Sequence, residues 1–229
     1  MKPVAFEYCR PDTVEEALDL LKEFGGDASI ISGGLSLGAM LNMRLVRPKA
    51  LIDINGLSEL ASARAGDATI ATGTLVRQAA AMKFPELMSG VPLLAKALPN
   101  VGHYQTRSRG TLGGSVAHAD PSAEIPLTLV TLAGAVKLRS PRGSRDVPAR
   151  EFFHGLLTTD RRADEMITGL TWPIRREFTG YAFDEIAQRH GDFAIAAVAV
   201  AATVGGDGTI AELSFGLGGV EDRPLVAET

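Results

Sequence analysis

Ser32-Gly33-Gly34-Leu35-Ser36 and Thr111-Leu112-Gly113-Gly114-Ser115 are the two stretches that decide the fold of this 229-residue chain. Each combines adjacent glycines with hydroxyl side chains, and such loops let a backbone approach a phosphate and bind its oxygens through N–H and O–H donors. Neither stretch has the Gly-Lys-Ser/Thr ending of a Walker-type P-loop. Together they predict a nucleotide or dinucleotide held mainly by backbone.

The residues around the first loop predict a small βαβ-like unit. Apolar strands are expected at 29–31 and 50–54, with a helix at 37–44 between them, so the loop follows the carboxyl end of a strand. The segments 61–65 and 69–72 around Gly66-Asp67 then predict a hairpin. A hairpin at this point breaks the alternation of strands and helices and argues against a plain Rossmann domain.

Further elements follow from capping residues and hydrophobic periodicity. Helices are predicted at 14–24, 75–82 and 92–98 and from Pro121-Ser122 onward, and strands at 136–139, 145–147, 165–172, 181–186, 193–204 and 210–217. The polar stretch 103–109 is expected to be a loop. The last three strands follow one another with no helix between them, so their apolar face is expected to need helices from downstream or from a partner.

Composition excludes several classes of function. A formal charge of −4 gives no cationic footprint for nucleic acid or an anionic membrane surface. The only cysteine, Cys9, cannot form an internal disulfide or supply a cysteine-ligated iron–sulfur or zinc site, and it is expected to be a packed residue in a reducing cytoplasm. No signal peptide or membrane span is predicted, since the longest apolar stretch, 193–204, is too short to cross a bilayer.

With both loops placed, the chain resembles the FAD-binding medium subunit of the molybdenum hydroxylases, the family of xanthine dehydrogenase and carbon monoxide dehydrogenase. The resemblance is carried by Phe6-Glu7-Tyr8 through Arg10-Pro11, Ser32 to Leu37, Arg44 through Arg47-Pro48 to Ile52-Asp53-Ile54-Asn55, Arg109 to Ser115 with Ala117-His118-Ala119-Asp120-Pro121, and Arg189-His190-Gly191-Asp192-Phe193-Ala194. One Gly-Gly-x-Ser segment alone is a weak signal and fits a tight turn, whereas two glycine-rich loops in this order, with Ala-His-Ala-Asp-Pro behind the second, are specific.

The resemblance implies an α+β chain with a two-subdomain FAD-binding fold of the PCMH (vanillyl-alcohol oxidase-like) type, followed by an incomplete antiparallel sheet domain. The implied divisions are 1–58, 59–176 and 177–229. By matching positions it implies two sides of one FAD cleft. The implied cofactor-binding residues are Ser32, Gly33, Gly34, Leu35, Ser36 and Leu37 around the diphosphate, Thr111, Leu112, Gly113, Gly114 and Ser115 opposite, Val101 against the flavin, Asp120 and Glu124 for ribose or ribityl hydroxyls, and Ile167 beside the adenine or flavin.

The implied activity is electron transfer. Substrate would be oxidised at a molybdopterin in a large subunit, electrons would pass through a small two-cluster 2Fe-2S subunit, and the FAD of this chain would deliver them to an acceptor. No catalytic or metal-binding side chain is expected here, because flavin chemistry belongs to the cofactor. Two other readings remain open, a stand-alone flavin oxidoreductase of the same fold and an assembly module without flavin.

Two departures from the family pattern stand out. Asp184 and Glu185 occupy the place where animal relatives have a lysine near the flavin, and the match is expected to break off at Gly218, which predicts a truncated third domain that is less stable alone. Other polar residues have structural explanations. His118 fits a backbone-bonded histidine better than a general base, and Arg107 and Arg109 fit a solvated loop better than a phosphate or partner contact.

Overall fold

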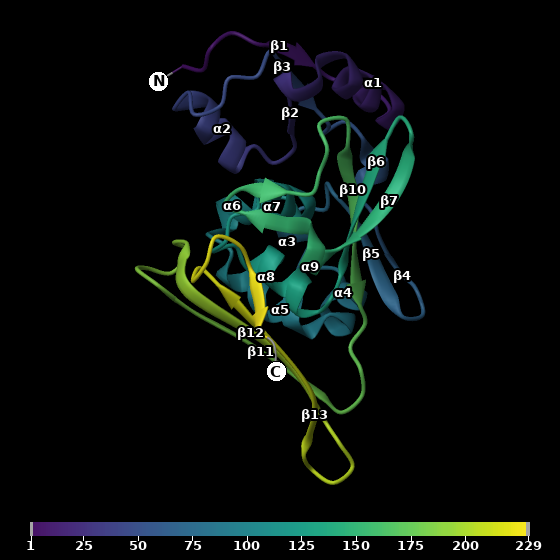
Figure 1. Ribbon diagram of the computed structural model, residues 1–229, viewed down its shortest axis with the longest axis vertical. Helices are drawn as coiled ribbons and strands as arrows, with labels where there is room; N and C mark the ends of the chain where they lie inside the picture. Colours follow the sequence, from purple (N-terminus) through teal and green to yellow (C-terminus); the bar gives the residue numbers. More distant parts are fainter. Residues whose placement is uncertain (1, 228–229) are drawn as a thin grey trace.

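The computed structural model describes residues 2–227 as an elongated molecule with mixed helices and sheets, which confirms the α+β class (Figure 1). The helices are α1 Val14–Phe24, α2 Leu35–Asn42, α3 Gln78–Ala81, α4 Pro85–Gly90, α5 Pro92–Ala97, α6 Tyr104–Arg109, α7 Leu112–His118, α8 Glu124–Thr131 and α9 Ala149–Phe152. The strands are β1 Glu7–Cys9, β2 Ala28–Ile31, β3 Ala50–Asp53, β4 Ala63–Ala65, β5 Thr69–Gly73, β6 Ala135–Ser140, β7 Gly143–Pro148, β8 Phe153–Gly155, β9 Thr158–Thr159, β10 Met166–Pro173, β11 Thr179–Ala187, β12 Ala194–Val204, β13 Ile210–Gly218 and β14 Leu225–Ala227.

The N-terminal unit, purple at the top of Figure 1, is a three-stranded parallel sheet in the order β1-β3-β2 with α1 and α2. Helix α1 begins where the sequence predicts, because the Thr13 hydroxyl accepts a hydrogen bond from the Glu16 backbone N–H at 3.2 Å. Its apolar stripe, Val14, Leu18 and Leu21 included, is buried in one cluster with Ile52. The predicted βαβ-like arrangement of β2, α2 and β3 is confirmed.

A five-stranded antiparallel sheet in the order β4-β5-β10-β6-β7 forms the middle of the molecule. It contains both predicted hairpins. Trp172 of β10 is fully buried, and its indole N–H donates to the Thr72 hydroxyl of β5 at 2.9 Å. The bond satisfies a polar group that would otherwise be orphaned in the core.

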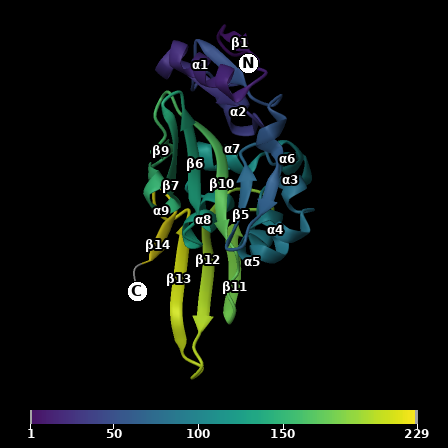
Figure 2. The same ribbon diagram turned by 90° about the vertical axis from the view of Figure 1, so that its right-hand side faces the viewer.

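The C-terminal sheet has the order β11-β12-β13-β14, and Figure 2 shows its long strands extending beyond the middle sheet. The expectation that nothing in the chain covers this sheet is wrong. Helices α5 and α8 pack on one of its faces, where Ala197, Ala199 and Gly216 leave room for them. The sequence pattern missed this because the covering helices precede the strands by more than forty residues.

Three local predictions also need correction. The polar stretch 103–109 is helix α6 rather than a loop, and the helix predicted at 75–82 is only the single turn α3. Helix α8 begins at Glu124, three residues after Pro121, because Asp120 first forms a turn in which its Oδ1 accepts from the Ser122 N–H at 2.9 Å. No helix within 2–227 combines the length and the apolar character needed to cross a membrane.

Both glycine-rich stretches begin helices. In the first glycine segment (Ser32–Leu37), Gly34 adopts a left-handed backbone with φ of 74° immediately before α2. In the second glycine segment (Thr111–Ser115), Thr111 caps α7 by accepting from the Gly114 N–H at 2.9 Å. The segments are therefore rigid starts of helices rather than free loops. The proposed divisions near residues 58 and 176 stay a prediction.

Candidate functional site

A cavity of about 370 Å³ lies between the N-terminal unit and the middle of the molecule. Both glycine segments line it, together with Ala28 to Ile30 of β2, Ile54, Thr74 and Gln78 around α3, and Met166 and Ile167 of β10. Its wall is thus built from segments far apart in the sequence. A cleft with apolar walls and a few convergent polar groups is the usual form of a cofactor site.

The two glycine segments touch across this cavity. The hydroxyl oxygens of Ser32 and Thr111 lie 3.2 Å apart. A Cβ added at Gly33 would lie 2.6 Å from the Arg109 carbonyl oxygen, and one added at Gly114 would lie 2.9 Å from the Ser32 hydroxyl. Glycine is therefore required at both positions for the segments to approach this closely.

Hydrogen bonds of Asn55 and Arg77, the polar clamp, hold the first glycine segment close to the residues before the second. The Asn55 side-chain amide donates to the Ser32 carbonyl at 2.7 Å and to Asp53 Oδ1 at 2.6 Å. Arg77 donates through Nη2 to Asn55 Oδ1 at 2.6 Å and through Nη1 to the Arg109 carbonyl. Arg77 thereby joins Asn55, just after β3, to Arg109, two residues before the second glycine segment. Its role escaped sequence analysis because Arg77 is 22 residues from Asn55 and belongs to no motif.

The two segments offer different chemistry to a ligand. Backbone N–H groups of the second segment are already bonded, since Leu112 donates to the Val76 carbonyl, Gly113 to the Thr74 carbonyl and Gly114 to the Thr111 hydroxyl. Within residues 2–227, the N–H groups of 33–37 have no protein acceptor. The first segment is thus the donor surface, while the second contributes close approach and hydroxyl groups.

The carboxylate side of the cavity carries Asp120 and Glu124. Glu124 is buried, and this burial raises its pKa to about 7, with the negative charges of Glu185 and Asp120 acting in the same direction. Burial also raises the pKa of Glu185, and its Oε2 atom has no hydrogen-bond partner among residues 2–227. Near neutral pH, Glu124 can therefore act as a hydrogen-bond donor as well as an acceptor.

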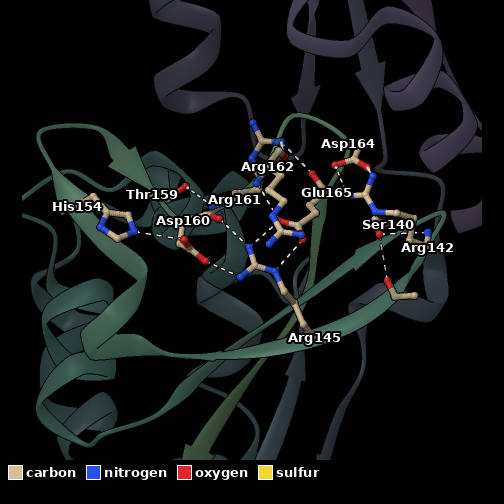
Figure 3. A network of polar contacts seen from close by, with 11 residues as sticks. Ser140, Arg142, Arg145, His154, Thr159, Asp160, Arg161, Arg162, Asp164 and Glu165 are labelled. Atoms are coloured by element: carbon tan, nitrogen blue, oxygen red, sulfur yellow. Dashed lines mark hydrogen bonds and ion pairs between the residues drawn. The ribbon is translucent and has the colours of Figure 1, made fainter.

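Two further polar residues at the cavity were missed. Gln78 is buried, and its Oε1 atom finds no donor within residues 2–227. Arg161 reaches the wall from the turn between β9 and β10 and is one of the residues of the polar network in Figure 3. No sequence signal separates Arg161 from an ordinary solvated turn, because its partners are backbone carbonyls.

Every residue predicted from the sequence lines this cavity except Leu112, which is buried in the main apolar cluster. Val101, Asp120, Glu124 and Ile167 are thus brought together with both glycine segments. His118 also lines the cavity, whereas Arg107 and Arg109 do not. Arg107 instead donates to the Pro99, Val101 and Gly102 carbonyls at 2.8–3.2 Å. No cluster of metal-ligating side chains occurs in the part of the chain that the structure describes.

Comparison with protein families divides the chain between two models. Residues 4–175 match the FAD binding domain in molybdopterin dehydrogenase, and residues 181–229 match the CO dehydrogenase flavoprotein C-terminal domain. The expectation that the resemblance ends at Gly218 is therefore wrong, since the second match extends to the last residue. Asp184 and Glu185, which stand where the resemblance leads one to expect a lysine, lie inside this second match.

Curated relatives are subunits of dehydrogenases. The chain is 39% identical over 201 residues to caffeine dehydrogenase subunit beta of Pseudomonas sp. (strain CBB1), covering 87% of this chain and 68% of the relative. It is 41% identical over 204 residues to the 6-hydroxypseudooxynicotine dehydrogenase complex subunit alpha of Paenarthrobacter nicotinovorans, covering 89% and 69%. Identity to the carbon monoxide dehydrogenase medium chain of Hydrogenophaga pseudoflava is 33% over 228 residues, covering 100% and 79%.

Solved structures of related oxidoreductases have the same fold as this chain. Carbon monoxide dehydrogenase from Hydrogenophaga pseudoflava superposes with a TM-score of 0.96 at 35% identity, covering 100% of this chain and 79% of that one. Quinoline 2-oxidoreductase from Pseudomonas putida 86 superposes with a TM-score of 0.93 at 36% identity, covering 99% and 78%. With its cleft and both family matches in place, the chain belongs to the FAD-binding medium subunits of the molybdopterin-dependent dehydrogenases, which are oxidoreductases.

Proposed function

We propose that the cavity between the two glycine segments is the FAD site of this chain, and that the chain carries electrons from an iron–sulfur partner to an external acceptor. One observation carries the proposal. Ser32 and Thr111, 79 residues apart, meet at 3.2 Å on the wall of a single cavity. Two helix starts held this close, with side chains absent at Gly33 and Gly114, form a cradle for a diphosphate.

The residues present fit such a group. The free N–H groups of 33–37 supply donors for phosphate oxygens, and the Ser36 and Ser115 hydroxyls line the same cavity. The unpartnered Gln78 Oε1 can accept from a ligand hydroxyl or amide. Asp120 and Glu124 are placed to accept from ribityl or ribose hydroxyls, and Val101 and Ile167 provide apolar walls. Bound FAD would supply the redox chemistry, while these side chains position it.

The proposed partners are a large molybdopterin-binding subunit and a small 2Fe-2S subunit. The single cysteine of the chain is buried and cannot supply the several thiolates that a cluster needs, so the clusters are assigned to another subunit. A cytoplasmic location belongs to the same proposal, because a lone thiol stays reduced there. The organic substrate would be selected by the large subunit.

Flavin content of the purified chain tests the proposal. We expect a yellow protein with a flavin absorbance spectrum and close to one FAD per chain after reconstitution. Gly114→Val is expected to lose the flavin, because its side chain would meet the Thr111 and Ser32 hydroxyls. Gly38→Ala is the control, since an added Cβ there meets nothing within 4 Å. A folded wild-type chain that takes up no FAD would favour the flavin-free assembly module instead.

A further inference from the structure

Arg161 is the only lysine or arginine side chain that lines the cavity among residues 2–227. The other charged or titratable lining residues are His118, Asp120 and Glu124. Glu124 enters from the start of α8 and Asp120 from the turn just before it, whereas Arg161 enters from the turn between β9 and β10. The cavity therefore receives its carboxylates and its cation from different parts of the chain.

The Arg161 guanidinium is only partly bonded. Its Nη1 atom donates to the Arg162 carbonyl at 3.0 Å and to the Glu165 carbonyl at 2.9 Å. Within the described chain, Nε and Nη2 have no acceptor, and neither atom is fully buried. Burial lowers the pKa of Arg161 without discharging a guanidinium at neutral pH. Three N–H donors of a largely desolvated cation thus stay free.

Arg145 occupies the carboxylates that could otherwise neutralise Arg161. Figure 3 shows Arg145 between Asp160 and Glu165. Arg145 donates to Glu165 through Nε at 2.7 Å and Nη2 at 2.8 Å, and to Asp160 Oδ2 through Nη1 at 2.5 Å. Glu165 Oε2 also accepts from the Arg162 N–H at 2.8 Å. Because Arg145 engages both carboxylates, the only protein acceptors of the Arg161 guanidinium among the described residues are two backbone carbonyls.

We propose that Arg161 is the cation of the cleft that binds the phosphate oxygens of the bound dinucleotide, and that Arg145 is the positioning residue that keeps it free to do so. This inference rests on the proposed FAD site and names the group that Arg161 recognises. A dianionic diphosphate is repelled by Asp120 and Glu124 and attracted by a guanidinium that donates to no carboxylate of its own. The free N–H groups of 33–37 and the free donors of Arg161 line the same cavity, so both are available to phosphate oxygens held there.

Binding of three probes to the flavin-stripped chain tests the role of Arg161. FAD and ADP carry the diphosphate, while riboflavin carries no phosphate. A charge-assisted hydrogen bond contributes roughly 1.5–3 kcal/mol, so Arg161→Gln is expected to weaken FAD and ADP binding about tenfold to a hundredfold. Riboflavin binding should stay unchanged, and the salt dependence of FAD binding should fall. Arg162→Gln is the matched control, since the exposed Arg162 side chain does not line the cavity.

The outcomes separate this inference from the proposed function. If the wild-type chain binds FAD and Arg161→Gln binds it as tightly as Arg162→Gln does, the role of Arg161 is refuted and the FAD site stands. If the wild-type chain binds neither FAD nor ADP, both proposals fail. If it binds ADP but not FAD, and Arg161→Gln abolishes that binding, the phosphate contact stands and the FAD site does not.

A second variant tests the positioning role of Arg145. Arg145→Gln is expected to weaken FAD and ADP binding but not riboflavin binding, when measured well below the melting temperature of the variant. Arg145→Lys should restore part of the loss, because it keeps a cation beside Glu165 and Asp160. Equal weakening of FAD and riboflavin would mean that Arg145 only supports the fold.

Discussion

Gly33→Ala is the sharpest test of how the two glycine segments meet. The added Cβ would lie 2.6 Å from the Arg109 carbonyl oxygen and 3.0 Å from the Gly110 Cα. Both neighbours are backbone atoms, so neither can rotate away. Ordinary contact begins near 3.4 Å, and the N-terminal unit must therefore move away from the second segment by about 0.8 Å.

The expected cost follows from that displacement. Overpacking of this kind costs about 1–3 kcal/mol of unfolding free energy. In a chain of this length, the loss corresponds to a fall of about 2–12 °C in the melting temperature. The displacement also strains the Arg77 bond to the Arg109 carbonyl and the Ser32–Thr111 contact. Loss of one or two such bonds should weaken FAD binding by about fivefold to thirtyfold.

Thermal unfolding of the flavin-free chain and a fluorescence titration with FAD measure the two effects separately. Gly38→Ala is the matched control, because its Cβ meets nothing within 4 Å and alanine favours a helix interior by roughly 0.5–1 kcal/mol over glycine. If Gly33→Ala matches Gly38→Ala in both melting temperature and FAD affinity, the segments do not depend on close contact and the cradle is wrongly described.

Three further predictions concern the clamp, a buried acid and the core. Arg77→Met should lower FAD affinity about tenfold in the same titration, because Asn55 and the Arg109 carbonyl lose their common partner. Glu124→Gln should make the flavin-free chain more stable in urea at pH 8 than wild type by about 3 kcal/mol, since the wild-type pKa is about 7 when folded and 4.5 when unfolded. The free energy of unfolding of the wild type falls by this amount as the pH rises from 4.5 to about 7, because over that range the unfolded chain has released the Glu124 proton and the folded chain still holds it. Thr72→Val should cost about 1–3 kcal/mol in urea unfolding, because the buried Trp172 N–H loses its acceptor.

Each of these has its own control. Lys83→Met removes an exposed cation near Arg77 in sequence and should leave FAD affinity unchanged. For Glu124, the difference between wild type and Glu124→Gln should shrink at pH 5, and a constant difference across this range would contradict the assigned burial of the acid. Thr69→Val places the same change at an exposed position of β5 and should alter stability little.

Local chemistry in the sequence was enough to place much of the fold. The Thr13 cap and the apolar stripe of α1, the strand before the first glycine segment, and the hairpins β4–β5 and β6–β7 all depend on neighbours within a few residues. Capping, periodicity and turn chemistry act over that range, so the chain itself reveals them. The family resemblance added the pairing of the two glycine segments.

Long-range contacts could not be predicted. Helices α5 and α8 cover the C-terminal sheet although they precede it, and α6 forms from a stretch that looks like a loop. The roles of Arg77 and Arg161 depend on partners far away in sequence or on backbone carbonyls, and neither kind of partner leaves a pattern in the residues nearby.

The sequence by itself determined that two segments combine adjacent glycines with hydroxyl side chains, and that a helix follows the first, because these are local properties of the residues. Only the structure showed that the second segment also begins a helix, α7. Only the tertiary structure decided that the two starts touch, and that the amides of the first remain free while those of the second are bonded to Val76, Thr74 and Thr111. The physical reason is that hydrogen-bond partners and electrostatic neighbours are assigned by distance in space, which the order of residues along the chain does not fix.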